Sequence, residues 1–243
     1  MSNILLIGKD LPDGNAFAEA LAGSENTVFT SAKSENEGVN FESEKIFATK
    51  WNKSSAISAH SLLINAETKL GQINHVVFYF DTTYFVTKFE LDKTEEVSAA
   101  LDTMVNPFLY ASGELIKRAD QKKEKLTVSF LVKNYPSKCE VTLNSSKNPG
   151  ILPASIIVST AEAAFTSLAE NFASYVKDRD YLSVILGRCN SANELYKSEK
   201  NLAQWLNDAY FSVNTAKVKQ NGKHACTWNK AGAKISTGFS LFK

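Results

Sequence analysis

Two side chains that can take part in proton transfer stand close together in the middle of the chain, Tyr135 and Lys138. An ammonium near a phenol lowers the pKa of the phenol and makes it a better general acid. The two residues lie three apart in a loop, where their side chains need not converge, and Tyr-Pro is also common turn chemistry. The pair is therefore either a candidate proton donor with its activating cation or a plain turn.

A glycine-containing turn follows the first apolar run of the chain. Gly8 and Gly14 lie on either side of Pro12. Glycines at such a turn let backbone N–H groups and a helix N-terminus approach the phosphates of a nucleotide. Pro12 has no N–H and fixes φ at about −65°, so the loop cannot wrap a phosphate in the usual way. The spacing fits a weakened nucleotide turn and a tight strand-to-helix turn equally well.

Composition narrows the class of protein. The chain has 243 residues, 44% of them hydrophobic, enough for one large core without disulfides or metal. The formal net charge is +1, which gives no reason to expect a nucleic acid or an anionic membrane as partner.

Three widely spaced cysteines without a Cys-x-x-Cys pair predict reduced thiols and no metal site. The first apolar run, 4–7, is too short for a secretory signal, and no stretch approaches the roughly 20 apolar residues of a membrane span. We therefore expect a cytoplasmic protein.

Apolar runs alternate with helical patterns along the chain. The expected strands are 3–8, 27–31, 45–49, 75–80, 126–132, 181–186 and 223–228. The expected helices are 16–22 with Asn15 as its N-cap, 54–70, 94–119, 154–176 and 200–210, and 134–153 is expected to be irregular. This alternation predicts right-handed crossovers and a single α/β domain over 1–243, with a doubly wound, mostly parallel, Rossmann-like sheet covered by helices on both faces.

The helix expected at 154–176 carries the most specific pattern. Its Ala163-Ala164-Phe165 run resembles the catalytic helix of the short-chain dehydrogenase/reductase family, in which Tyr and Lys, four residues apart, precede such a run. In that alignment Val158 stands at the place of the Tyr and Glu162 at the place of the Lys. A valine carries no proton, and a carboxylate disfavours a nearby phenolate. The resemblance thus implies the scaffold of the family without its reaction.

The same resemblance identifies candidate cofactor contacts. Gly8, Pro12 and Gly14 occupy the three glycine places of the family's Gly-x-x-x-Gly-x-Gly turn. The acidic residue that holds the adenosine ribose is missing, and Lys33 nearby would suit a 2′-phosphate, which favours NADP over NAD if either binds. Asp81 stands where the family has small residues against the cofactor.

Other catalytic places of the family are also altered. Asn106 is the candidate for the family's helix Asn, although Thr103 fits the family's spacing to Phe-Leu better. Lys133-Asn134 stands where the catalytic Ser is expected. The resemblance places a substrate lid at about 189–199, a polar stretch that predicts a mobile cover.

Three hypotheses follow. The first is a non-catalytic protein that keeps the fold to bind a nucleotide or another small ligand, or for regulation. The second is an active NAD(P)-dependent carbonyl reductase whose catalytic groups are relocated to Tyr135 and Lys138. The third is an assembly role, since the helices expected at 94–119 and 154–176 have wide apolar faces and their counterparts in the family pack against other copies. This predicts a homo-oligomer, with an active paralogue as the alternative partner. Those faces would equally serve to cover the sheet.

Overall fold

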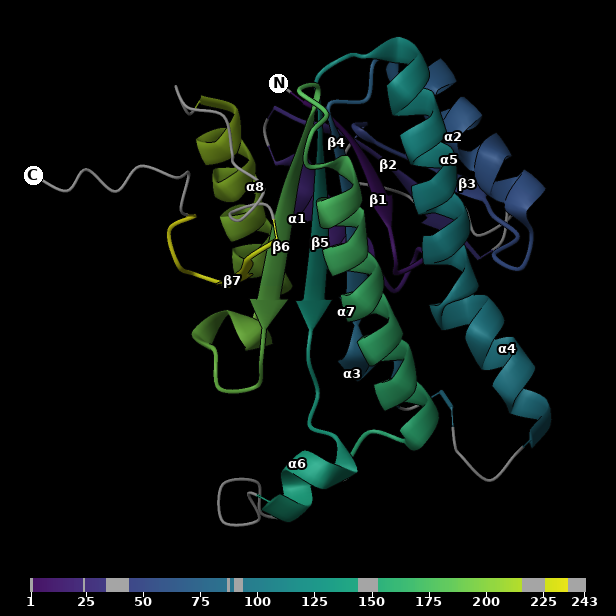
Figure 1. The fold of residues 1–243 in the computed structure, drawn as a ribbon, viewed down its shortest axis with the longest axis vertical. Helices are drawn as coiled ribbons and strands as arrows, with labels where there is room; N and C mark the ends of the chain where they lie inside the picture. The colour runs from purple at the N-terminus through teal and green to yellow at the C-terminus, as the bar shows by residue number, and fades with distance from the viewer. Residues whose placement is uncertain are drawn as a thin grey trace, which may run out of the picture.

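A seven-stranded parallel sheet forms the centre of the protein in the computed structural model (Figure 1). The model describes residues 2–23, 25–33, 44–86, 88–89, 94–143, 153–215 and 226–235. The strands are β1 (Asn3–Ile7), β2 (Thr27–Ala32), β3 (Ile46–Lys50), β4 (His75–Asp81), β5 (Leu126–Lys133), β6 (Leu182–Cys189) and β7 (Trp228–Lys230). Their order is β3-β2-β1-β4-β5-β6-β7, and each adjacent pair is parallel. The predicted α/β fold class is confirmed.

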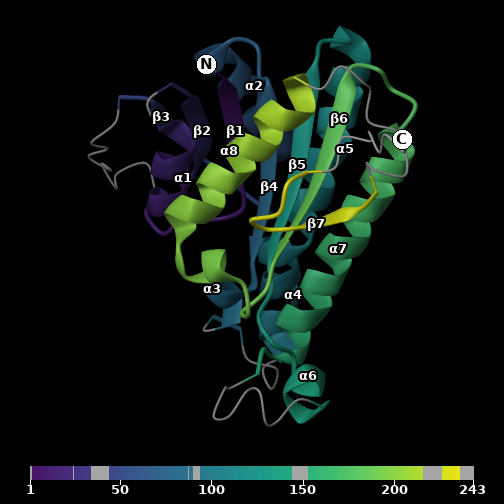
Figure 2. The same cartoon turned by 90° about the vertical axis from the view of Figure 1, so that its left-hand side faces the viewer.

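Helices cover both faces of the sheet (Figures 1 and 2). On one face lie α1 (Asn15–Ala22) and α8 (Glu199–Thr215), which pack against each other. The other face carries α2 (Ala56–Leu70), α4 (Thr94–Met104), α5 (Asn106–Lys122) and α7 (Ile156–Val176). Three short helices follow the carboxyl ends of strands: α3 (Thr82–Val86), α6 (Lys138–Leu143) and the 3-10 helix η1 (Glu194–Lys197).

The central strand shows why this sequence forms a doubly covered sheet. Every residue of β4 is buried, as expected for a parallel strand with helices on both sides. Phe78 packs towards one face, with its ring centroid 4.8 Å from that of Phe130. Tyr79, next in sequence, points to the other face and stacks on Phe17 of α1 at 4.4 Å.

The helix predicted over 94–119 is in fact two helices. The first, α4, ends at Met104, and α5 begins at Asn106 with Pro107 in its first turn. Pro107 has no N–H to continue the hydrogen-bond ladder of α4, but its fixed φ suits the start of a new helix. The apolar periodicity runs through this break, which is why the sequence pattern resembled one long helix.

Smaller corrections concern the loops and the helix starts. The stretch 134–153, expected to be irregular, contains α6. The last strand begins at Trp228, and residues 223–225 of the predicted strand lie outside the described part of the chain. Asn15 is the first residue of α1, after Gly14 as N-cap, and no side-chain hydrogen bond caps this helix. Ser155, by contrast, caps α7 by accepting a hydrogen bond from the N–H of Val158.

Candidate functional site

The connections of the sheet reverse direction between β1 and β4. From β1 the chain continues outward to β2 and β3, whereas β4 leads the other way to β5, β6 and β7. In open α/β sheets the crevice at the carboxyl ends of two such strands is where ligands bind. The residues that follow β1 and end β4 and β5 therefore define the candidate site.

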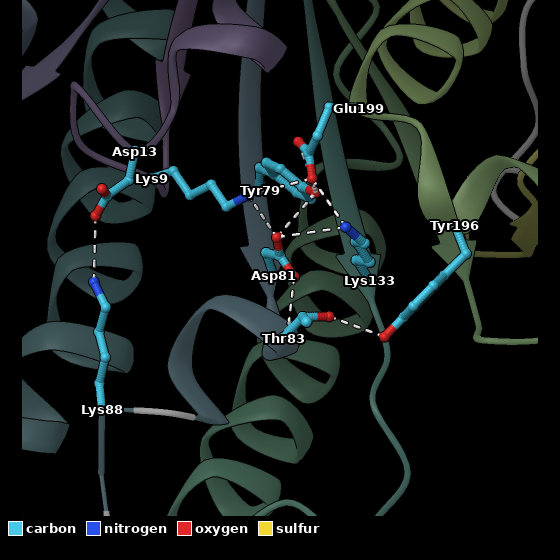
Figure 3. Close-up of polar contacts among 9 residues, drawn as sticks. All are labelled: Lys9, Asp13, Tyr79, Asp81, Thr83, Lys88, Lys133, Tyr196 and Glu199. Atoms are coloured by element: carbon cyan, nitrogen blue, oxygen red, sulfur yellow. Dashed lines mark hydrogen bonds and ion pairs between the residues drawn. The ribbon is translucent and has the colours of Figure 1, made fainter. Parts of the chain in front are cut away.

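Four charged side chains meet at this crevice (Figure 3). Lys9 follows β1, Asp81 ends β4, Lys133 ends β5, and Glu199 begins α8. The Lys9 ammonium lies 2.6 Å from Asp81 Oδ2 and 3.2 Å from Glu199 Oε1. The Lys133 ammonium lies 2.9 Å from Glu199 Oε1 and 3.7 Å from Asp81 Oδ2. We call these four residues the carboxyl-edge cluster; its two ammoniums and two carboxylates balance one another.

A buried phenol completes the arrangement. The hydroxyl of Tyr79 donates to the carboxylate of Glu199, 3.1 Å from Oε1. Burial, together with the negative charges of Asp81 and Glu199, raises the pKa of Tyr79 well above its usual value. Burial alone would lower the pKa of Lys133, but the same two carboxylates outweigh it and raise that pKa. The phenol thus holds its proton, and Lys133 its charge, more firmly than an ordinary tyrosine and lysine.

The two positions aligned with the family's catalytic pair lie on α7. Val158 is fully buried in the apolar core. Glu162 accepts a hydrogen bond of 2.5 Å from the hydroxyl of Thr82 and another from the side-chain amide of Asn134. Burial raises the pKa of Glu162, and the two hydrogen bonds oppose that rise. Its carboxyl group therefore ties α7 to the ends of β4 and β5.

The segment expected to be a substrate lid is attached at several points. It begins at Cys189, the last residue of β6, contains η1 and ends at Glu199. The Tyr196 hydroxyl lies 2.9 Å from that of Thr83, and the Lys133 ammonium lies 5.1 Å from the centre of the Tyr196 ring. Asn193, near the middle of the segment, donates from its side chain to the carbonyl of Ala231 at 2.7 Å.

The glycines of the first turn are explained by close packing. At Gly8, where φ is +154°, an added Cβ would lie 2.0 Å from the carbonyl oxygen of Tyr79. At Gly14 an added Cβ would lie 2.7 Å from the carbonyl oxygen of Lys9. Both positions require glycine with or without a nucleotide.

The remaining predicted site residues are not brought together. Lys33 forms an ion pair with Asp13 at 2.6 Å. Asn106 donates to the carboxylate of Asp102 at 2.8 Å and so bridges α4 and α5. Tyr135 is half-buried against the apolar core, whereas Lys138 is exposed at the start of α6, so this phenol and ammonium lie in different surroundings.

Sequence reasoning did not identify the carboxyl-edge cluster as a unit. Asp81 and Lys133 are each visible in the sequence as departures from the family's pattern, but the sequence does not indicate that they lie close together. The sequence did contain a signal for this cluster. One charged residue stands at or just after the end of each of three buried strands; these residues are Lys9, Asp81 and Lys133. Parallel strands that are neighbours in a sheet bring such ends together.

The described ranges contain neither a cluster of metal-ligating side chains nor a membrane-spanning helix. Among those residues no three His, Cys, Asp or Glu side chains are grouped so that they could hold a metal ion. Within the same ranges no helix has the length and apolar character needed to cross a bilayer.

Solved structures resemble nearly the whole chain. A short-chain dehydrogenase from Mycobacterium smegmatis superposes with a TM-score of 0.65 at 11% identity, covering 97% of this chain and 93% of that one. A short-chain dehydrogenase/reductase from Serratia marcescens gives 0.59 at 13% identity, covering 95% and 97%. A 3-ketoacyl-(acyl-carrier-protein) reductase from Brucella melitensis, complexed with NADH, gives 0.62 at 12% identity, with the same coverage. No protein-family model and no curated protein matches the sequence. The likeness establishes the fold, and it confirms the predicted resemblance to short-chain dehydrogenases/reductases at that level.

Proposed function

We propose that this chain is a non-catalytic protein with the short-chain dehydrogenase/reductase fold. The observation that carries the proposal is the state of α7, where buried Val158 and hydrogen-bonded Glu162 stand at the places of the family's Tyr and Lys. Neither residue can deliver a proton to a carbonyl oxygen with the help of an adjacent ammonium. What remains is a well-packed scaffold.

The tyrosines around the crevice support the proposal. Catalysis of this kind needs a phenol whose pKa is lowered towards neutrality. Burial instead raises the pKa of Tyr79, of Tyr84 and of Tyr196. Lys133 lies near the ring of Tyr196, but its ammonium is held by Glu199, so it does not activate that phenol.

Activity assays test the proposal directly. With NADH or NADPH and a panel of aldehydes, ketones and 3-ketoacyl thioesters, we expect turnover slower than about 0.01 s⁻¹, roughly a thousandth of a typical enzyme's rate. Tyr135→Phe should leave this background unchanged, as should Tyr175→Phe, a control at an exposed tyrosine of α7. Genuine turnover that Tyr135→Phe abolishes and Tyr175→Phe retains would instead establish an enzyme with relocated groups.

We further propose that the chain assembles with copies of itself through α4, α5 and α7. Large apolar side chains are exposed on these helices; they are Val97, Leu101, Leu109, Ile156 and Tyr175. Between α5 and α7 runs a groove of about 440 Å³, and Gly113 is among the residues that line it, with no atom within 4 Å of where its Cβ would stand. The inner residues of the same helices, such as Phe108 and Phe165, cover the sheet, so these helices have apolar residues on two sides. A net charge of +1 opposes self-association only weakly.

Light scattering coupled to gel filtration tests this assembly. We expect the wild-type chain to elute as a dimer or larger, and Leu109→Asp with Tyr175→Asp to elute as a folded monomer, because two carboxylates would be buried in the interface. Ile57→Asp is the matched control, since Ile57 is exposed on α2, outside the proposed interface. A wild-type monomer at micromolar concentration would rule this interface out.

A further inference from the structure

We propose that the crevice between β1 and β4 does not accept NAD(P), because this chain's own side chains and amides occupy the places of the cofactor's contacts. This inference goes beyond the loss of catalysis. A non-catalytic protein can still bind a dinucleotide, and many structural features of such a site are independent of the catalytic pair.

The backbone of the first turn is the first observation. A pyrophosphate site needs free N–H groups at the turn and at the start of α1. Here the N–H of Leu11 donates to the carbonyl of Ser31 at 2.9 Å, that of Gly14 to Asp10 at 2.9 Å, and that of Asn15 to Pro12 at 3.0 Å. Pro12 has no N–H to offer. The turn is thus fastened to itself and to the end of β2.

The charge of that turn is the second observation. Asp10 accepts from the Ser31 hydroxyl at 2.6 Å and pairs with Lys53 at 2.7 Å. Asp13 pairs with Lys33 at 2.6 Å, a contact that lowers the pKa of Asp13 to about 2, so it is a carboxylate at neutral pH. Asp13 thus engages Lys33, the cation that the sequence suggests for a 2′-phosphate, and Asp10 engages Lys53. Neither lysine is free to bind a phosphate unless its ion pair is broken.

The carboxyl-edge cluster is the third observation. It joins the ends of β1, β4 and β5 to the start of α8, across the mouth of the crevice (Figure 3). The side chains of Lys9, Lys133 and Asp81 are at most 12% exposed. Separating these buried charges to admit a dinucleotide would leave them without partners, which is strongly unfavourable. Two cavities of about 550 and 510 Å³ lie elsewhere, beside Gly232.

Thermal denaturation of the full chain with 1 mM NAD, NADH, NADP or NADPH tests the inference. We expect each dinucleotide to shift the Tm by less than about 0.5 °C. A ligand whose Kd is about one hundredth of its concentration would instead raise the Tm by about 5 °C or more. A reproducible rise with any of the four overturns the inference. If that rise comes without turnover, the proposed loss of catalysis still stands, so the two proposals fail separately.

Two variants of the lid segment test whether the cluster holds the crevice closed. Glu199→Gln removes the carboxylate shared by Lys9 and Lys133, and we expect it to lower the Tm by about 5 °C. Glu194→Gln is the matched control, an exposed carboxylate five residues earlier, and should change the Tm by less than about 1 °C. Equal stability of the two variants would overturn the cluster's role in filling the crevice.

Discussion

Gly8→Ala is expected to destabilise the protein by about 4 kcal/mol or more, or to prevent it from folding. The new Cβ would lie 2.0 Å from the carbonyl oxygen of Tyr79, on the backbone of the central strand β4, which cannot move without breaking its pairing with β1 and β5. The φ of +154° adds backbone strain for any residue other than glycine. Urea denaturation followed by circular dichroism measures the loss.

Gly113→Ala is the control for this substitution. Gly113 lies within α5, and an added Cβ there meets no atom within 4 Å. Alanine has the higher helix propensity, so this variant should gain about 0.5–1 kcal/mol of stability. If Gly8→Ala were as stable as the wild type, this would contradict the close contact between Gly8 and the backbone of β4.

The second large effect is a loss of stability in acid that comes from His75. This side chain is fully buried at the start of β4, where its Nε2 lies 2.7 Å from the hydroxyl of Ser129 and its ring stacks on Tyr210. Burial lowers its pKa from 6.5 to about 3. Between these two pH values the unfolded chain binds a proton that the folded chain does not. The stability is therefore complete above about pH 6.5 and falls by up to about 1.4 kcal/mol for each pH unit below it.

Denaturation curves between pH 4.5 and 8 measure this effect. In His75→Gln the neutral amide can still form a hydrogen bond with Ser129, and it does not titrate. Between pH 7 and pH 4.5 the free energy of unfolding of this variant should therefore fall by about 2–3 kcal/mol less than that of the wild type. His60→Gln is the control, because His60 is exposed on α2. This variant should lose as much stability in acid through His75 as the wild type does. Equal acid sensitivity in His75→Gln and the wild type would contradict the assignment.

The fold was predictable because its signals are local. Each buried strand is a short run of apolar residues, and the stripe on α7 repeats at helical spacing, so neither depends on contacts distant in sequence. The break at Val105 was also present in the sequence, as Asn106-Pro107, but the apolar periodicity continues across it and outweighed the proline in our interpretation.

The candidate site was only partly predictable, because its contacts join distant parts of the chain. The loss of the Tyr and Lys was visible at Val158 and Glu162, since it concerns residue types alone. The partners of Glu162, by contrast, are 80 and 28 residues away, at Thr82 and Asn134. Lys9 and Glu199 are 190 residues apart and meet only because α8 starts at the carboxyl edge of the sheet. A composition or spacing pattern does not contain such pairings.

The carboxyl-edge cluster has a consequence for the motions of this protein. Enzymes need loops that open and close over the ligand, and such segments are drawn from the least stable part of a structure. Here the ends of β1, β4 and β5 and the start of α8 are joined by ion pairs, so Glu199, at the end of the lid segment, is attached to three central strands of the sheet. Amide hydrogens along this edge should then exchange with solvent mainly through global unfolding. The carboxyl edge of the sheet, which opens and closes in a working enzyme, would in this chain belong to the part whose amide hydrogens exchange most slowly.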